Sequence, residues 1–551
     1  MTGPKSQSDE SPTAAAAIPV DERSDRLNTK AAGIIGLAVM CSRVLGLARE
    51  LIFAALFGGG RALDAFTVAF RIPNLLRDLF AEGALSTAFV TTFSKTIARG
   101  GDGAAWRLAN KVATMATLVL GVLCVLGMVF SGSLVGLLAP GFDADKAALT
   151  AQLTRIMFPF ILLVSIAALV MGMLNAKNVF GVPAMASSFF NIGSIVGGLL
   201  LGYWIDPHFG VRALIGLAFA TVIGGALQLI VQLPSLARLG YRFRPDLHWR
   251  DAGVRAVLLL MGPSVIAAST TQFNVLINSV FASGLEDGAI FWLAAAFRLM
   301  QLPLGIFGVA LGTVTLPLLS RLVVAGRLDA FRSELARAMR WAMLLTLPAM
   351  AGLMMLAEPI ISVVYQHGKF NAYEAAQAAG ALRFYAIGLA GYAALKVLVN
   401  AFYAMDRRKT PMLVSFLAVG LNLLFNWVFT VRLGWGHRGL AFSTGCVATF
   451  NFLLLYILMQ TQLRGLESRR LFVLLVKIAL ASASLVAVCA ASSHWLLADW
   501  PHQALLPKVA ALLVTVVAGA AVFAACGILL HIEELKELRD AFMRRLKRQR
   551  S

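Results

Sequence analysis

The stretch GIIGLAVMCSRVLGLARELIFAALFG, residues 33–58, decides the fold class of this chain. It is long and apolar enough to cross a bilayer core as one helix, which takes about 20 residues. Yet it contains three charged side chains, Arg43, Arg49 and Glu50. Each charge at the centre of a membrane helix costs about 2.5–3.5 kcal/mol on insertion scales and is tolerated where it faces protein, water or a ligand. We therefore predict a membrane protein whose first span borders a polar interior.

Apolar blocks of similar length recur along the whole chain, which predicts an all-α polytopic membrane protein. The 551 residues are 59% apolar and only 14% charged, whereas soluble domains carry about 25% charged residues. The mean hydropathy of +0.78 leaves too little polar surface for a water-soluble globule. We predict fourteen transmembrane helices: 31–57, 64–91, 112–137, 150–174, 183–204, 212–236, 256–283, 288–319, 341–365, 375–404, 411–432, 438–461, 471–497 and 507–531.

Lysine and arginine alternate between rich and poor loops along these predicted spans. If the N-terminus is cytoplasmic, the cytoplasmic loops and tail hold roughly four times as many basic residues as the opposite loops, as the positive-inside rule requires. We therefore expect both termini in the cytoplasm. The same distribution explains the net charge of +20 without nucleic acid, which we do not expect as a partner. Residues 1–28 are expected to be a disordered cytoplasmic tail, and 532–551 a basic cytoplasmic tail.

A weak internal repeat predicts two related bundles. PGFDADKAALTAQLTRIMFPFILLVSIAALVMGMLNAKNVFGVP at 140–183 resembles HGKFNAYEAAQAAGALRFYAIGLAGYAALKVLVNAFYAMDRRKTP at 367–411, about six spans later. Because six is even, the copies share an orientation, and their pseudo-two-fold axis runs along the membrane normal. We expect a six-helix lobe at 29–236, a second at 250–461, and two extra helices at 471–531. Such repeats favour a rocking transporter; the alternative is a duplication without rocking.

Arginines in the apolar spans mark the candidate substrate site. The second span contains Asp64, Arg71, Arg77, Asp78 and Glu82, together with Pro73, which bends or breaks a helix. In the eighth span Arg298 is the lone charge, and a cleft between two bundles would bring it opposite the first span. Arginine binds phosphate with two hydrogen bonds and keeps its charge at any pH. The pattern indicates an anionic substrate.

Three asparagines form a second candidate site. Asn422 and Asn426 lie one helical turn apart in the eleventh span, and Asn278 lies in the seventh. Their amide oxygens could join a small-cation site; the alternative, which we favour because no carboxylate is among them, is hydrogen bonding between helices. We find no enzyme signature, no metal-spaced histidines and no phosphate-binding loop. The five cysteines lie in apolar blocks and are interpreted as packing residues, so no cofactor is expected.

Five motifs together resemble one family. They are SRVLGLARE at 42–50, DAFTVAFRIPNLLRDLFAEGALSTAFV at 64–90, RLMQLPLGIFGVALGTVTLP at 298–317, YQHGKF at 365–370 and FYAMDRRKTP at 402–411. The resemblance, over roughly 30–530, is to the MurJ (MviN) lipid II flippases of the multidrug/oligosaccharidyl-lipid/polysaccharide exporter superfamily. It implies a protein of the bacterial inner membrane that moves lipid II, the undecaprenyl-diphosphate-linked peptidoglycan precursor, from the cytoplasmic to the periplasmic leaflet.

The resemblance also assigns residues. It places the family's central-cavity arginines on Arg43, Arg49 and Arg298, and further important positions on Arg77 and Asp64. It implies that helices 471–531 form a groove for the lipid tail. Some members bind sodium at positions that match Asn278, Asn422, Asn426 and Thr444, but this sequence has amides where they have acids, so coupling to sodium, to protons or to the membrane potential stays open.

The resemblance implies three kinds of partner: lipid II, inner-membrane lipids and other cell-wall synthesis proteins. Two rival functions remain at this point. One is a drug or cation exporter of the same superfamily, which predicts acidic cavity residues. The other is a non-transporting scaffold for cell-wall enzymes, which predicts that the arginines are dispensable.

Overall fold

The computed structural model describes residues 29–78, 85–497 and 504–540, and every regular element in these ranges is a helix. Ten of these helices are long and apolar enough to cross a membrane, or eleven if α15 and α16, which meet at 42°, count as one span. The prediction of an all-α, many-span membrane protein is confirmed. The predicted tail 1–28, the end of the basic tail at 541–551, and Glu82 in the second span lie outside the described residues.

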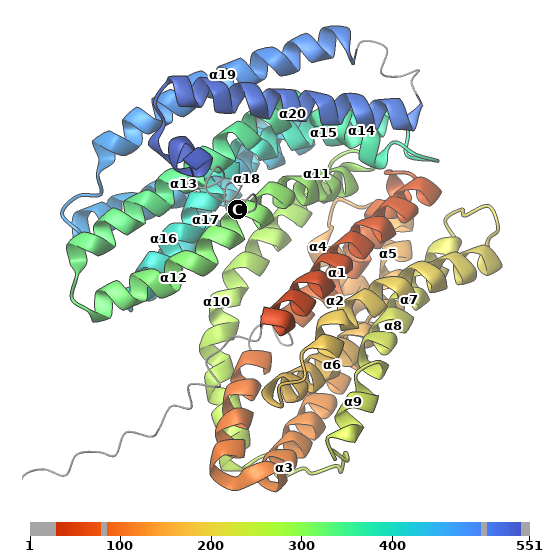
Figure 1. Cartoon of the computed structure of the whole chain (residues 1–551). Coiled ribbons are helices and arrows are strands. Elements are labelled where there is room, and N and C mark those ends of the chain that lie inside the picture. Colours follow the sequence, from red (N-terminus) through yellow and green to blue (C-terminus); the bar gives the residue numbers. More distant parts are fainter. Residues whose placement is uncertain (1–28, 79–84, 498–503, 541–551) are drawn as a thin grey trace, which may run out of the picture.

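The first group of helices packs mainly through α1 against α7, α7 against α8, α2 against α5 and α3 against α6. It forms the red-to-yellow part of Figure 1. Its helices are α1 Thr29–Phe57, α2 Arg61–Arg77, α3 Ser86–Val129, α4 Ser131–Leu138, α5 Ala144–Met157, α6 Pro159–Ala176, α7 Gly181–Ile205, α8 Ala213–Ile230 and α9 Leu233–Arg238.

The second group packs through α11 against α15, α16 against α18, and α13 against α16 and α19. It forms the green-to-blue part of Figure 1. Its elements are α10 Ala252–Ser283, α11 Ala289–Pro303, η2 Leu304–Gly308, α12 Val309–Val324, α13 Leu328–Met355, α14 Ala357–Tyr365, α15 Ala372–Ile387, α16 Leu389–Ala404, α17 Lys409–Asn426, η3 Trp427–Arg432, α18 Gly436–Gln462, α19 Ser468–Trp495 and α20 Leu505–Leu529.

Several predicted spans are broken or shifted in the structure, and two of them show the physical reason. The loop expected between 91 and 112 is helical and belongs to α3, whose two parts meet at Gly101 with φ of 68°, a conformation that glycine adopts without steric cost. The eighth span is also not one regular helix. After Pro303 the chain makes the π-helical turn η2 before α12, because proline cannot donate the regular backbone hydrogen bond.

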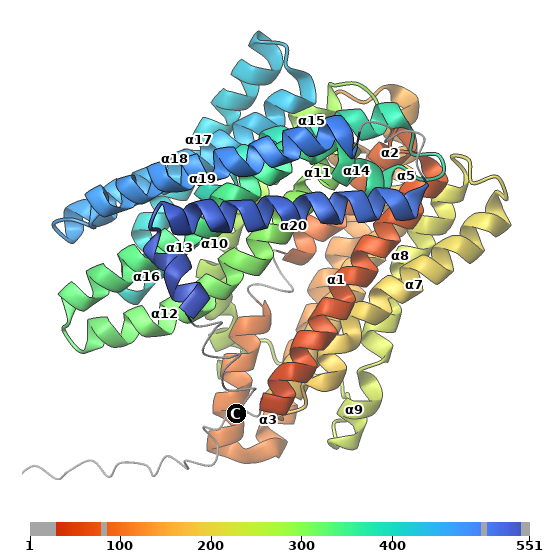
Figure 2. The same ribbon diagram turned by 45° about the horizontal axis from the view of Figure 1, so that its top comes forward.

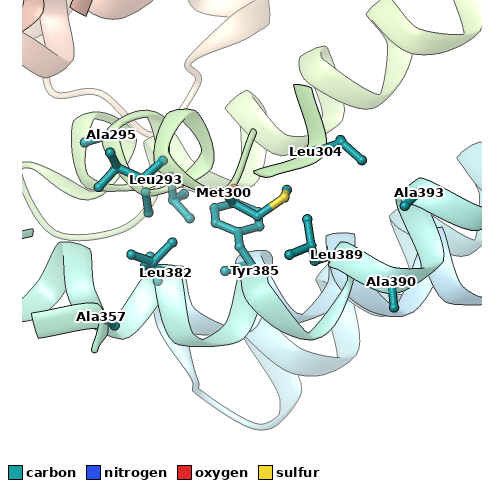
Figure 3. Packing of buried hydrophobic residues seen from close by; sticks show 14 of the residues in the cluster. Leu293, Ala295, Met300, Leu304, Ala357, Leu382, Tyr385, Leu389, Ala390 and Ala393 are labelled. Atoms are coloured by element: carbon teal, nitrogen blue, oxygen red, sulfur yellow. The ribbon is translucent and has the colours of Figure 1, made fainter. Parts of the chain in front are cut away.

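Buried apolar side chains hold the second group together. Figure 3 shows Leu293 and Met300 of α11 beside Leu382, Tyr385 and Leu389 of α15 and α16. All five are less than 9% exposed. Dense packing of this kind makes the group a rigid support for any polar side chains that project from it.

The last two helices lie on the outside of the second group. In Figure 2, α19 and α20 run side by side, and α19 packs on α13. Their outer surfaces are apolar: Leu506 is 82% exposed and Val517 66%. Exposed side chains of this kind suit contact with lipid.

The two groups meet at one end of the molecule and diverge toward the other (Figure 1). Contacts join α2 to α11, α1 to α14 and α4 to α10. A separate contact joins the first turns of α10 to α3, where Val254 and Val257 share an apolar cluster with Leu108 and Val112. The polar side chains between the groups are therefore presented by α1, α2, α10 and α11.

Candidate functional site

An ion pair joins the two groups across their interface. Arg298 of α11 lies 2.5 Å, Nη2 to Oε2, from Glu50 of α1, and its other terminal nitrogen lies 3.5 Å from the backbone oxygen of Gly46. The hydroxyl of Tyr365 donates to the second oxygen of Glu50 at 2.8 Å. The Glu50 side chain is only 12% exposed, whereas that of Arg298 is 41% exposed. Part of the Arg298 guanidinium therefore remains accessible.

Arg49 lies next to this pair on α1. Its guanidinium lies over the ring of Phe190 at 5.0 Å and of Phe70 at 5.9 Å. Aromatic faces attract a cation through their quadrupole but do not cancel its charge. The charged neighbours of Arg49 are Glu50, Arg77 and Arg298. Three guanidinium groups thus lie close to the Glu50 carboxylate.

Arg43 lies two turns earlier on α1 and is exposed. Its guanidinium reaches Gly305 in η2, where a Cβ atom would lie 3.2 Å from Nη1. Lys396 of α16 is a charged neighbour of Arg43 and is also exposed; its side chain lies against Gly308. We did not single out Lys396 in the sequence, although the cost of a lone lysine in an apolar span applies to it as it does to Arg298.

Two arginines of α2 complete the polar interior. Arg77 pairs with the adjacent Asp78 at 2.9 Å. Asp78 also lies 3.5 Å from the amide nitrogen of Asn74, one turn earlier. Arg71 reaches across to the second group and donates to the hydroxyl of Ser279 on α10. We call Arg43, Arg49, Arg77, Arg298 and Lys396 the basic group; the carboxylates that pair with it in the described part of the chain are Glu50 and Asp78.

Asp64, which the family resemblance placed with the arginines, lies at the closed end instead. It is 1% exposed, and both of its oxygens are occupied. Oδ1 accepts from the backbone nitrogen of Phe291 at 2.9 Å, and Oδ2 accepts from that of Gly288 at 2.7 Å and from Lys146 Nζ at 3.0 Å. A side chain of the first group therefore caps the first turn of α11 in the second group.

The ionic contacts continue from Asp64 toward solvent. Lys146 lies 2.7 Å from Asp287, Arg61 lies 3.5 Å from the other Asp287 oxygen, and Arg61 also pairs with Asp143. The Arg61 hydrogen bonds hold the pKa of the Asp143 carboxyl well below its usual range. Charges of alternating sign thus run across the interface. We call Asp64, Lys146, Asp287, Arg61 and Asp143 the latch.

Glycines bring the two groups into backbone contact beside the latch. A Cβ atom on Gly141 would lie 2.5 Å from the Cα of Gly284, and the nitrogen of Gly141 donates to the Ser283 hydroxyl at 3.1 Å. Gly288 has a φ of 102°, and a Cβ there would lie 2.6 Å from the backbone oxygen of Gly59. Side chains other than hydrogen would separate the groups at both places.

The structure brings together the four residues of the candidate cation site. Asn278 Oδ1 accepts from the amide nitrogens of Asn422 at 3.1 Å and Asn426 at 2.7 Å, and Asn278 Nδ2 lies 3.5 Å from the Thr444 hydroxyl. These are the interhelical hydrogen bonds of the alternative interpretation. No group of three or more histidine, cysteine, aspartate or glutamate residues in the described ranges could hold a metal ion.

A cavity of about 360 Å³ lies inside the second group, next to the asparagines. Its lining includes side chains of α10, α11 and α15 to α18, and one residue of the first group, Arg71. The polar residues that line it are Arg71, Thr270, Thr271, Asn274, Asn278, Tyr385, Tyr392, Ser415, Asn422, Thr444 and Asn451.

Comparisons with known proteins agree on one family. The family model described as lipid II flippase MurJ matches residues 53–510. The chain is 37% identical over 467 residues to the lipid II flippase MurJ of Burkholderia cenocepacia, covering 83% of this chain and 89% of that one. It is 34% identical over 459 residues to the probable lipid II flippase MurJ of Buchnera aphidicola from Acyrthosiphon pisum, covering 82% and 88%.

Solved structures share the fold. A lipid II flippase MurJ in an inward closed conformation matches with a TM-score of 0.74 at 23% identity, over 90% of this chain and 98% of that one. An inward-facing multidrug resistance transporter of the MATE family matches with a TM-score of 0.62 at 15% identity, over 79% and 99%. At these identities the matches show a common architecture, and chemistry must be argued from the side chains.

Proposed function

The chain belongs to the lipid II flippase MurJ family, and on that premise we propose how its polar interior moves the substrate. It is a multi-pass membrane protein that flips lipid II. We propose that the basic group binds the diphosphate of the lipid II headgroup. The observation that carries this proposal is the concentration of positive charge: Arg43, Arg49, Arg298 and Lys396 lie together, and the carboxylate that pairs with them within the described ranges is Glu50. Unpaired charge in a membrane interior is costly, and a bound diphosphate would offset that cost.

We place this site on the cytoplasmic side of the closed end. The positive-inside distribution supports fourteen crossings with both termini in the cytoplasm. In that orientation α1 begins at the cytoplasmic side, and the latch, at the start of α2, α5 and α11, faces the periplasm. The described conformation then has its groups joined on the periplasmic side and apart on the cytoplasmic side. The headgroup would enter from the cytoplasm, while the lipid tail follows the outer face of α19 and α20.

Glu50 links substrate binding to movement in this proposal. It pairs with Arg298 across the interface and accepts from Tyr365 of the second group. A diphosphate that binds Arg298 competes with Glu50 for the same guanidinium. Losing that partner weakens one contact that holds the two groups together. A ligand moves a conformational equilibrium only through such differential contacts, so the headgroup would favour rocking of lobes 29–236 and 250–461 toward the periplasm.

Complementation tests the arginine assignment. Arg43→Ala and Arg298→Ala are expected not to support growth of a strain depleted of its own flippase, although both proteins reach the membrane. Arg212→Ala, an exposed arginine in the loop before α8, is the matched control and is expected to support growth. Normal growth with either cavity variant would show that the basic group does not carry the substrate.

A leaflet-resolved assay separates the rivals. Rapid depletion is expected to leave lipid II on the cytoplasmic leaflet. An exporter of drugs or cations would leave lipid II unaffected and change drug resistance instead. A scaffold would leave flipping intact in the arginine variants.

The driving force is a separate proposal. Sodium, protons and the membrane potential are three candidate sources, and the absence of a carboxylate among Asn278, Asn422, Asn426 and Thr444 argues against sodium at that cluster. Flipping in vesicles is therefore expected to continue when choline replaces sodium. A loss of flipping on this replacement would show that transport depends on sodium and would overturn this expectation.

A further inference from the structure

The cavity of about 360 Å³ inside the second group has a chemistry that the basic group does not share. We propose that this cavity, here called the amide pocket, binds a sugar of the lipid-linked substrate while the basic group binds its diphosphate. The proposal rests on the proposed function and names a second subsite of the same headgroup. Its volume lies within the range of about 300–1,000 Å³ that is typical of small-molecule sites.

Unsatisfied hydrogen-bonding groups in the amide pocket show what a ligand must supply. The side-chain oxygens of Asn274 and Asn451 are buried, and no described residue donates a hydrogen bond to either. Both residues line the pocket. A buried polar atom without a partner costs about 1–3 kcal/mol. A ligand that donates hydrogen bonds to these two oxygens would remove that cost.

Arg71 shows what else the ligand must supply. It is the lining residue that comes from the first group, and its one hydrogen bond to a described side chain is to Ser279. A guanidinium carries five donors, so several of them remain for a ligand. The ligand must therefore accept hydrogen bonds as well as donate them.

These demands exclude simple ions. The positive charge of Arg71 repels a metal cation, and a halide cannot donate to the oxygens of Asn274 and Asn451. Hydroxyl groups both donate and accept, and a sugar presents several on one small ring. The rings of Phe297, Tyr385 and Tyr392 add apolar surface to the wall. Apolar walls with a few convergent polar groups are the usual form of a pocket for a small organic molecule.

Two helices carry side chains of both the amide pocket and the basic group. Ala294 lines the pocket, and Arg298 follows four residues later on the same face of α11. Tyr392 lines the pocket, and Lys396 follows four residues later on the same face of α16. Side chains at this spacing lie about 5–6 Å apart at their Cβ atoms. A sugar attached directly to the diphosphate can therefore reach the pocket while Arg298 and Lys396 contact the phosphates.

Binding of two lipids tests the pocket separately from the basic group. Purified full-length protein is titrated with lipid II and with undecaprenyl diphosphate, which lacks the sugars. Asn274→Leu and Asn451→Leu are each expected to bind lipid II about tenfold more weakly, because one acceptor is lost. Both should bind undecaprenyl diphosphate as the unsubstituted chain does. Asn110→Leu, a buried amide of α3 whose side chain hydrogen-bonds the backbone of Arg242 and Arg244, is the matched control.

The outcomes distinguish the two proposals. Unchanged affinity of both pocket variants for lipid II would overturn the amide pocket and leave the proposed function standing. Arg49→Gln should weaken binding of both lipids; if it weakens neither, the role of the basic group fails instead. Equal weakening of both lipids by the pocket variants would also overturn the subsite, because it would indicate a general effect on the fold.

Thiol labelling at Thr271→Cys gives a second measurement that does not depend on the leucine variants folding. Thr271 lines the pocket and is exposed, so this small change should be tolerated. Lipid II is expected to slow its reaction with a small maleimide at least fivefold relative to undecaprenyl diphosphate, with the unsubstituted chain as background. Equal protection by the two lipids would show that no sugar enters the pocket.

Discussion

The latch and the basic group are both charged clusters between the same two helix groups, but they are built on opposite principles. In the latch, each buried charge has its partner: Asp64 accepts from Lys146 and from two backbone nitrogens, and Lys146 also meets Asp287. In the basic group, Glu50 is the carboxylate of the described residues that lies among Arg49, Arg298, Arg43 and Lys396, and the Arg298 side chain is 41% exposed.

The difference indicates which charges hold the protein together and which await a ligand. A buried charge whose contacts are all made within the protein contributes to one conformation and is costly to disturb. A charge left partly exposed and in surplus gains its partner from outside. Four substitutions can break or sharpen this contrast.

The largest effect is expected from Lys146→Met in the latch. The change leaves the buried carboxylate of Asp64 without its cation, and breaking a buried pair in this way costs about 3–5 kcal/mol. We expect a lower melting temperature and faster thiol labelling at Ser283→Cys beside the latch. Adding Asp64→Asn should recover most of the loss, because it removes the uncompensated charge. A stable single variant would show that the latch does not hold the groups together.

The next effect is expected from Arg49 in the basic group. Arg49→Ala should weaken diphosphate binding by about 1.5–3 kcal/mol, the usual value of a charge-assisted hydrogen bond, without lowering the melting temperature. Arg49→Lys should recover part of the binding, since the charge remains but the two-pronged geometry is lost. Titration with undecaprenyl diphosphate and thermal unfolding measure the two quantities. If Arg49→Ala lowers the melting temperature as much as Lys146→Met does, the basic group stabilises the fold as the latch does, and the contrast between the two clusters is wrong.

A gain of affinity is expected from Glu50→Gln, because Glu50 is the counter-ion of Arg298. Glutamine still accepts from Tyr365 but no longer neutralises Arg298. Binding of undecaprenyl diphosphate should tighten several-fold, by about 1 kcal/mol, since a competing anion is removed. Flipping should slow, because binding no longer breaks a contact between the groups. Weaker binding would indicate that Glu50 positions Arg298 rather than competing for it.

The smallest effect is expected at the solvent end of the latch. Arg61 and Asp143 are 42% and 53% exposed, and exposed ion pairs add little stability. Arg61→Gln should leave the melting temperature unchanged at neutral pH. The lowered pKa of Asp143 contributes stability that is fully present above the ordinary carboxyl pKa and is lost only as the pH falls through the lowered value. The difference between the melting temperatures of the unsubstituted chain and the variant should therefore stay small and constant from pH 8 down to about 5. A difference that changes with pH in that range would show that another titrating group controls the stability.

The cost of charge in an apolar span was enough to identify Arg43, Arg49 and Arg298 from the sequence, and the structure brings them to one interior. The same cost could not separate Asp64 from them. Lys146, 82 residues away in the sequence, and backbone nitrogens at the start of α11 stabilise the buried charge of Asp64. These contacts exist only in the folded chain.

Helix existence was predictable, but helix continuity was not. Hydropathy marked the apolar blocks, and each predicted span overlaps a helix in the described ranges. It could not show that α3 runs through the expected loop to a break at Gly101, or that the chain after Pro303 takes a π-helical turn. Both depend on local backbone geometry, about which the mean hydropathy of a window carries no information.

The glycine contacts at the closed end bear on electrical insulation. A transporter with a charged, hydrated interior spans a membrane whose potential the cell must maintain, and a single file of water through the closed end would let protons leak. Because Gly141 and Gly284 carry no side chains, the two backbones come into direct contact there. Insulation at this point therefore depends on two glycines having no Cβ atom. Gly141→Ala would add one methyl group, and it could leave flipping intact while protons leak through the separated backbones.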